Sequence, residues 1–322
     1  MPFNESPERR KAKKEVFVTS REGKKRKTIS NFSSYAAAQE PGLYTHMFVE
    51  DISVGLMGFR HRTEDGRGRV RVEGDDAGKA SLNAICTSMS DYSRYDLAET
   101  VSSAIESVGT RLAWFGKVVY EVCGSATDIM LASVDPFHLF RVPGGFIQLV
   151  PKKDREWLAG RQYAFLPSTC AWVVRIPRRV TGAKSHQRLL AQLTAVSQPA
   201  PEFWTRELKD GKIATEFNVS EYNRRRDAYI ARLTRRWGWN RRDSGENHHT
   251  EFYYFFRSLR FRRAQAILRD HIVDELNRLL VRQEINARIQ LQGFLSAAQI
   301  DDLIKRALAG SMHYAEAWRE AR

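Results

Sequence analysis

The sequence lacks most features of a secreted, membrane-bound or disulfide-stabilised protein. Three of its 322 residues are cysteines, and Cys86, Cys123 and Cys170 are too widely spaced for a zinc knuckle or a disulfide framework. No apolar run approaches the roughly 20 residues that cross a membrane, and the first residues lack the apolar segment of a signal peptide. We therefore expect no membrane partner, and a protein that is assembled in the cytoplasm.

Motifs for catalysis or cofactor binding are equally scarce. Gly66-Arg67-Gly68 lies in a polar segment, without the strand and the helix that a phosphate-binding glycine loop joins. No nucleophile elbow occurs, and the carboxylates lack the paired spacing of a general acid and a general base. His271 and Glu275 lie one helical turn apart, but such a pair is more often a solvated helix flank than a metal site. We therefore predict no enzymatic activity, no cofactor and no metal.

The positive charge of the chain, a formal net of +14, is concentrated in two segments. Residues 1–30 contain ten Lys or Arg and four Glu, and residues 220–263 contain twelve Arg and five acidic residues, so the remainder is close to neutral. Basic segments favour a polyanion, above all nucleic acid, because neutralised phosphates release counterions. For residues 1–30, a disordered solubilising arm is an equally weighted alternative.

The second basic segment provides the candidates for DNA or subunit contact. Its arginines alternate with aromatic residues such as Trp237 and Tyr253. Arginine forms forked contacts with phosphate, and aromatic rings stack on bases, but the same composition also serves ion pairs between subunits. Both alternatives stay open for the candidates, which are Arg224, Arg225, Arg226, Arg235, Arg236, Arg241 and Arg242.

Hydrophobic periodicity predicts an α+β fold, with amphipathic helices packed on antiparallel strands, a long central helix and a helical C-terminal region. A helix with apolar residues from Leu97 to Leu112, capped by Asp91 or Ser93, is expected to end at Gly116. Further helices are expected over residues 185–196, from 220, and over 251–282 and 296–308. One or two strands are expected over residues 47–59, and further strands over 69–73, 117–122, 128–131, 146–150, 171–176 and 285–291, with a turn at 74–78.

Composition divides the chain into three parts. Residues 1–45 are predicted to form a basic, flexible arm, residues 46–200 an α+β unit, and residues 201–322 a mainly helical region. The helix over residues 251–282 lacks glycine and proline, and its apolar residues change face halfway along. Such a helix is either central to one large core, or packs on its own subunit along one half and on a neighbour along the other. The candidate assembly face consists of Phe252, Phe255, Phe256 and Leu259.

Three segments carry a resemblance to a known family. An amphipathic helix ends in Trp114-Phe115-Gly116 and precedes KVVYEV, a turn and IMLASVDPFHLFRVPGGFIQLVP. Later come WGWNRRDSGENHHTEFYYFFRSLRFRRAQAILRDHIVDELNRLL and a closing strand with GFLSAAQIDDLIKRALAG. In pattern and order these segments, about half of the chain, resemble the wing, the long helix and the helical crown of tailed-bacteriophage portal proteins, the head-tail connectors.

The resemblance implies a structural protein of the virion that forms a homo-oligomeric ring, commonly a dodecamer, at one capsid vertex. Such a ring surrounds a channel through which double-stranded DNA is packaged and ejected. Its partners would be the terminase, the major capsid protein and the tail-adaptor protein, and it would have no enzymatic activity. The alternative hypothesis is a monomeric or dimeric nucleic-acid-binding protein, such as a replication or packaging factor, that uses the basic segments.

Overall fold

The computed structural model describes residues 17–19, 25–27, 41–58, 69–90, 96–124, 129–134, 136, 138–150, 155, 160–197, 219–242 and 250–321. Most of the predicted basic arm, and the predicted helix caps Asp91 and Ser93, lie outside these residues. Within the arm, β1 (Phe17–Thr19) and β2 (Lys25–Lys27) form an antiparallel pair.

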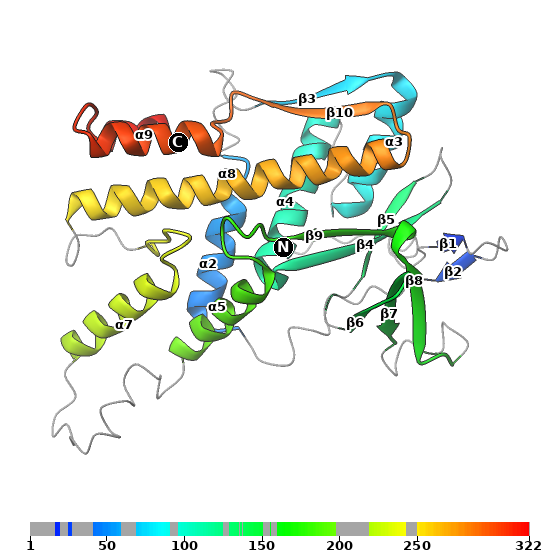
Figure 1. The fold of residues 1–322 in the computed structure, drawn as a ribbon, viewed down its shortest axis with the longest axis horizontal. Helices are drawn as coiled ribbons and strands as arrows, with labels where there is room; N and C mark the ends of the chain where they lie inside the picture. The colour runs from blue at the N-terminus through cyan, green and yellow to red at the C-terminus, as the bar shows by residue number, and fades with distance from the viewer. Residues whose placement is uncertain are drawn as a thin grey trace, which may run out of the picture.

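The fold is α+β, as predicted, with helices packed on small antiparallel sheets. The predicted long central helix, α8 (Glu251–Arg282), crosses the molecule from one side to the other (Figure 1). Helices α2 (Leu43–Val54) and α5 (Ala183–Val196) lie on one side of α8 and α9 (Ala297–Leu308) lies on the other, while α4 (Leu97–Phe115) crosses α8 (Figure 1). In the part of the chain that the structure describes, no helix is both long and apolar enough to cross a membrane.

Helix α4 forms as its sequence pattern indicates. Its inward residues recur at helical spacing and are fully buried: Val101, Ile105, Val108 and Leu112. Gly116 follows the helix in the left-handed conformation, with φ of 67°, which glycine adopts without strain. A Cβ atom at this position would lie 2.9 Å from the carbonyl oxygen of Ala183, so glycine also lets the end of α4 approach the start of α5.

The strands that follow α4 form two antiparallel sheets. In the first sheet, β4 (Lys117–Cys123) lies between β5 (Met130–Val134) and β9 (Ala171–Arg175). The second sheet consists of β6 (Leu139–Val142), β7 (Gly145–Leu149) and β8 (Tyr163–Pro167). The two sheets share a small apolar cluster that includes Val119, Leu139 and Leu166. This cluster holds the second sheet against the first, at one end of the molecule.

A third pairing joins distant parts of the sequence. Strand β3 (Arg69–Gly74) pairs with β10 (Ala287–Gln292), which follows α8. The side-chain amide of Asn277 in α8 fastens this pair: it donates to the carbonyl oxygen of Ile289 at 2.9 Å and accepts from the Ile289 amide at 2.8 Å. The C-terminal half of α8 is thereby tied to the early part of the chain.

The long helix is buried on two opposite sides, and its own chain supplies both packing partners. Leu268, Ile272 and Leu276 are fully buried in the main core, which also contains residues of α2, α4 and α5. Leu259 and Ala266, on the other side, are buried in a second cluster with α9 and α10 (Tyr314–Glu320). The main core draws on both the α+β unit and the helical region of the sequence-based division.

The structure corrects the prediction of one or two strands over residues 47–59, because α2 occupies most of this stretch. Its buried residues recur at helical spacing: Thr45, Phe48, Val49 and Ile52. Packing of this face against α4 and α5 outweighs the strand preference of valine, isoleucine and phenylalanine, which depends strongly on context.

The predicted turn at residues 74–78 is also corrected, because α3 (Asp76–Met89) begins inside it. Asp75 caps this helix by accepting a hydrogen bond from the amide of Gly78 at 2.6 Å. A Cβ atom on Gly78 would lie 2.2 Å from the carbonyl oxygen of Asn286. Glycine therefore serves a close approach to the start of β10 here and does not mark a turn.

His186 is a buried base that joins α5 to α4. It is 0% exposed, its Nε2 donates to the carbonyl oxygen of Ala113 at 2.7 Å, and its ring lies near Phe48 and Trp237. Burial disfavours the charged imidazolium and lowers the pKa of His186 from 6.5 to about 4. The folded protein therefore holds this histidine neutral at pH 7.

We predict that Leu268→Ala lowers the free energy of unfolding by about 2–5 kcal/mol, because it leaves a cavity in the main core. Val281, on the same helix but 77% exposed, provides the matched control. Val281→Ala should change stability by less than about 0.5 kcal/mol. Urea unfolding of the two variants measures the difference, and equal losses would contradict the assignment of α8 to the core.

His186 should make stability depend on pH. Its pKa is depressed in the folded state, so the unfolded chain binds the extra proton between about 6.5 and about 4. The contribution is therefore complete above pH 6.5 and is lost as the pH falls toward 4, by about 3 kcal/mol in total. Urea unfolding at pH 7 and pH 4.5 should show a smaller loss for His186→Gln than for the wild type. Parallel losses in the two proteins would mean that the folded state protonates His186 normally.

Candidate functional site

Two of the predicted contact arginines are paired with an acid on their own helix. Arg224 and Arg225 of α7 (Val219–Leu233) bind the carboxylate of Glu221, with nitrogen-oxygen distances of 2.8 Å and 2.6 Å. These hydrogen bonds lower the pKa of Glu221 to about 2, so the carboxylate stays ionised. The pair therefore presents less net charge to a ligand than the sequence suggests.

Three more of the predicted arginines bind acids elsewhere in the same chain. Arg226 and Arg241 both form ion pairs with the buried carboxylate of Asp227. Arg242 binds Glu50 at 2.7 Å and Asp51 at 3.0 Å, both on α2. These contacts fasten α7 and the segment after it to α2, so they serve the fold within one subunit.

Arg235 and Arg236 differ from the other five candidates. Both are exposed, and neither forms an ion pair with another residue that the structure describes. The structure therefore does not bring the seven candidates together on one basic surface. Arg236 instead lines a pocket whose other cations come from different parts of the chain.

The candidate assembly face is partly used within the subunit. Leu259 is 0% exposed and belongs to the cluster with α9 and α10, which corrects its assignment to a face for a neighbour. Phe256 packs against the same cluster, and Phe255 is half-buried beside Tyr254. Phe252 remains 47% exposed, although its ring contacts Phe256 and the ring of Tyr314.

A buried arginine that the sequence did not single out holds the α7–α8 junction together. Arg257 is 6% exposed, and its guanidinium donates to five acceptors on α7, on α8 and on the segment between them. The acceptors are the carbonyl oxygens of Ala231 and Trp239, the Oγ1 of Thr234, the side-chain oxygen of Asn240 and the hydroxyl of Tyr253. Burial lowers the pKa of Arg257, but a guanidinium keeps its charge in proteins.

The segment between α7 and α8 is shaped around this guanidinium. Trp237 and Trp239 are buried on either side of Gly238, whose φ of 82° requires glycine. A Cβ atom on Gly238 would lie 2.6 Å from the carbonyl oxygen of Arg257. The indole nitrogen of Trp239 donates to Asp51 of α2 at 2.7 Å, so α2, α7 and α8 meet at this point.

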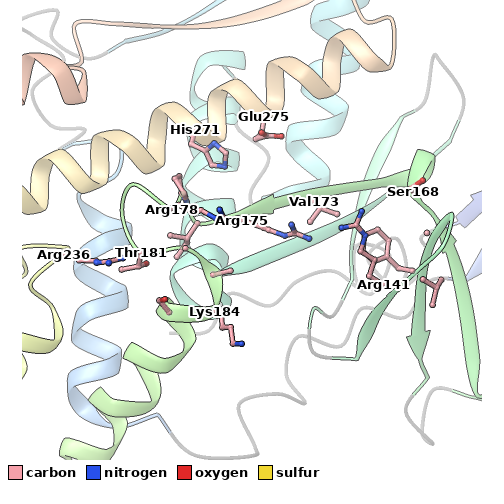
Figure 2. Close-up of a pocket in the computed structure, with 18 of the residues that line it drawn as sticks. Arg141, Ser168, Val173, Arg175, Arg178, Thr181, Lys184, Arg236, His271 and Glu275 are labelled. Carbon is pink, nitrogen blue, oxygen red and sulfur yellow. The ribbon is translucent and has the colours of Figure 1, made fainter.

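A basic pocket of about 940 Å³ lies beside α8, between the β6–β7 turn, the end of β9 and the start of α5. Five cationic side chains line it: Arg141, Arg175, Arg178, Lys184 and Arg236. His271 and Glu275 of α8 line the opposite wall, and Glu275 is the acidic residue among the lining residues. Figure 2 shows the labelled cations spread along the pocket, from Arg141 at one end to Arg236 at the other.

The cations of the pocket have no acidic partners among the residues with described positions. All five are exposed, and no ion pair is recorded for any of them, whereas Glu275 already binds Arg278 at 2.5 Å. The first turn of α5 adds to the positive potential, because Gly182, Ala183, Lys184 and Ser185 line the pocket and no side chain caps this helix. The pocket therefore presents unneutralised positive charge to an anion.

A local signal could have found this pocket in the sequence. Residues 175–184 contain Arg175, Arg178, Arg179 and Lys184 and no acidic residue. The positive charge of this short segment is hidden when net charge is summed over long segments, because acidic residues elsewhere offset it. His271 and Glu275, considered as a metal pair, lie in the pocket wall instead. Among the described residues, no group of three or more His, Cys, Asp or Glu side chains is arranged to hold a metal.

The second sheet carries an exposed apolar row on the face that turns away from the shared cluster. Phe140, Ile147 and Phe165 are direct neighbours across β6, β7 and β8, and we call them the aromatic row. Phe140 is 52% exposed and Phe165 is 48% exposed. Arg141 and Phe146, the adjacent cross-strand pair, point to the opposite face and line the basic pocket. The aromatic row and the pocket therefore use opposite faces of one sheet.

We predict that Arg257→Met lowers the free energy of unfolding by at least about 3 kcal/mol, because several buried acceptors lose their donor at about 1–3 kcal/mol each. Arg257→Lys should recover less than half of this loss, since an ammonium cannot form the planar fork. Arg260→Met, one turn later on α8, is the control and should cost less than about 1 kcal/mol. Full recovery with lysine, measured by urea unfolding, would show that charge alone matters at this position.

Comparison of the chain with protein-family models, with curated proteins and with solved structures gave no match. We therefore infer function from the geometry of the described residues, together with the resemblance in the sequence. Among the described residues, neither the aromatic row nor the basic pocket on the other face of the same sheet has a partner within the subunit.

Proposed function

We propose that this chain is a portal-type structural protein, whose subunits assemble into a homo-oligomeric ring at a capsid vertex. Double-stranded DNA would pass through this ring during packaging and ejection. The proposal joins the resemblance of the wing, long-helix and crown segments to a subunit surface that favours self-association. It assigns no catalytic step to the chain.

The aromatic row is the observation that carries the proposal. Monomeric soluble proteins rarely expose contiguous apolar patches larger than a few hundred Å², and exposed patches of apolar side chains are common at interaction sites. Phe140, Ile147 and Phe165 are contiguous across the three strands, and Tyr163, 59% exposed, lies two residues from Phe165 on the same face of β8. On the other face of the sheet, Leu139 and Leu166 are buried in the cluster shared with the first sheet, whereas the aromatic row is left for a second copy of the chain.

The long helix suits a subunit that is held in a ring. Its two sides are both packed within the chain, which gives each subunit a rigid axis across the whole molecule. Neighbouring subunits would then meet through the exposed sheet rather than through the predicted face of α8. In such a particle the terminase, the major capsid protein and the tail-adaptor protein would be further partners.

The basic pocket favours the second candidate, a monomeric or dimeric nucleic-acid-binding protein. Unneutralised arginines in a concave surface suit a nucleic-acid partner without any requirement for a ring. Electron microscopy with negative stain, and the molar mass in solution, separate the two functions. Rings support the portal-type proposal, whereas a stable monomer at every protein and salt concentration would overturn it.

We predict that Phe140→Asp combined with Phe165→Asp reduces self-association without unfolding the chain, because both side chains are about half exposed and a carboxylate is costly to bury unpaired. Leu43→Asp is the control. Leu43 is 65% exposed at the start of α2, where the helix dipole favours a carboxylate. Light scattering after size-exclusion chromatography should show a lower mass for the double variant alone. An unchanged ring in that variant would exclude the aromatic row from the subunit interface.

A further inference from the structure

The basic pocket fits an extended polyanion better than a compact one. A single phosphate group is bound most tightly where donors converge on one point. Here the five cations are distributed along the length of the pocket, from Arg141 on β6 through Arg175 and Arg178 to Arg236 after α7. Figure 2 shows the ends of this series well apart, with Lys184 of α5 on the wall facing α8. A chain of phosphates would meet successive cations along this path.

The residues that line the pocket favour contact with a nucleic-acid backbone over contact with exposed bases. Proteins that hold single strands stack the bases on aromatic side chains. Among the lining residues Phe146 is the sole Phe, Tyr or Trp, and it packs against the apolar cluster between the two sheets. The remaining wall consists largely of arginine, glycine and small residues. Such a surface contacts phosphates and reads no bases, as expected for a duplex.

The five pocket cations differ from several other arginines of the chain in having no ion-pair partner among the described residues. Arg224, Arg225, Arg241 and Arg242 each have a carboxylate partner in the chain. The five pocket cations have none among the described residues, and the uncapped first turn of α5 faces the same space. Positive charges that line one concave surface raise its potential together, so the pocket attracts an anionic ligand.

We infer that the basic pocket binds the phosphate backbone of double-stranded nucleic acid, independently of base sequence. The inference rests on the proposed function for the choice of double-stranded DNA as the duplex, and it adds the surface that the DNA contacts. The site lies on the other face of the β6–β7–β8 sheet from the aromatic row, so a subunit can use both surfaces at once.

The test is the salt dependence of binding to a short fluorescent DNA duplex, followed by anisotropy on the full-length chain. Each neutralised phosphate contributes about −0.9 to the slope of log K against log salt for duplex DNA. Arg175→Gln with Arg236→Gln removes two exposed cations from the middle and one end of the pocket. We expect the slope of this double variant to fall in magnitude by about two, with weaker binding to every duplex sequence.

The control is Arg224→Gln with Arg225→Gln, which removes the same formal charge from the helix α7 outside the pocket. Its slope should equal that of the wild type. Equal effects in the two double variants would mean that binding follows net charge, and would overturn the inference, as would no effect in either. Unfolding curves and circular dichroism on both variants exclude loss of the fold as the cause.

Competition experiments identify the ligand class. A single strand of the same length should compete less well than the duplex for the wild-type chain at equal nucleotide concentration. Inorganic phosphate, or an acidic peptide, that displaced the duplex more effectively than unlabelled duplex would overturn the assignment and indicate a compact anion or a protein segment instead.

The oligomeric state of the same variants separates this inference from the proposed function. If rings form and both double variants keep the wild-type slope, the pocket assignment fails and the portal-type proposal is unaffected. If no ring forms under any condition and the pocket variant alone loses duplex affinity, the portal-type proposal fails and the pocket assignment holds.

Discussion

The buried guanidinium of Arg257 is the contact on which the arrangement of the helices depends. It donates to α7, to the Trp237–Asn240 segment and to its own helix, and it has no carboxylate partner among the described residues. A buried cation is costly unless its donors are satisfied, so the surrounding backbone must present its acceptors in one geometry. That requirement fixes α7 relative to α8, and Trp239 extends the constraint to α2 through Asp51.

The ion pairs of the arginines show which positive charges are used within the fold and which remain exposed to a ligand. Ion pairs with Glu221, Asp227, Glu50 and Asp51 occupy five of the seven arginines that the sequence suggested as contact residues. The cations around the basic pocket remain without acidic partners in the described part of the chain. A high net charge therefore does not indicate by itself where a polyanion binds, because local pairing decides which charges are exposed to it.

The long helix shows what hydrophobic periodicity can predict and what it cannot. The two apolar sides of residues 251–282 follow from helical spacing, and the structure buries both. Spacing alone does not identify the partner of each side: α9 and α10 cover Leu259, which the sequence also allowed to face a neighbouring subunit. The helix over residues 43–54 was missed for a related reason, since its valines and isoleucines favour strands until packing against α4 and α5 is known.

The sequence by itself determined the α+β class, the bounds of α8, the β4–β5 hairpin and the end of α4 at a left-handed Gly116, because periodicity and glycine conformation are local properties. The tertiary structure alone decided the pairing of β3 with β10, the burial of Arg257 and the gathering of Arg141, Arg175 and Arg236 around one pocket. These features join residues far apart in the chain. Their positions depend on how whole elements pack, and no local pattern records that packing.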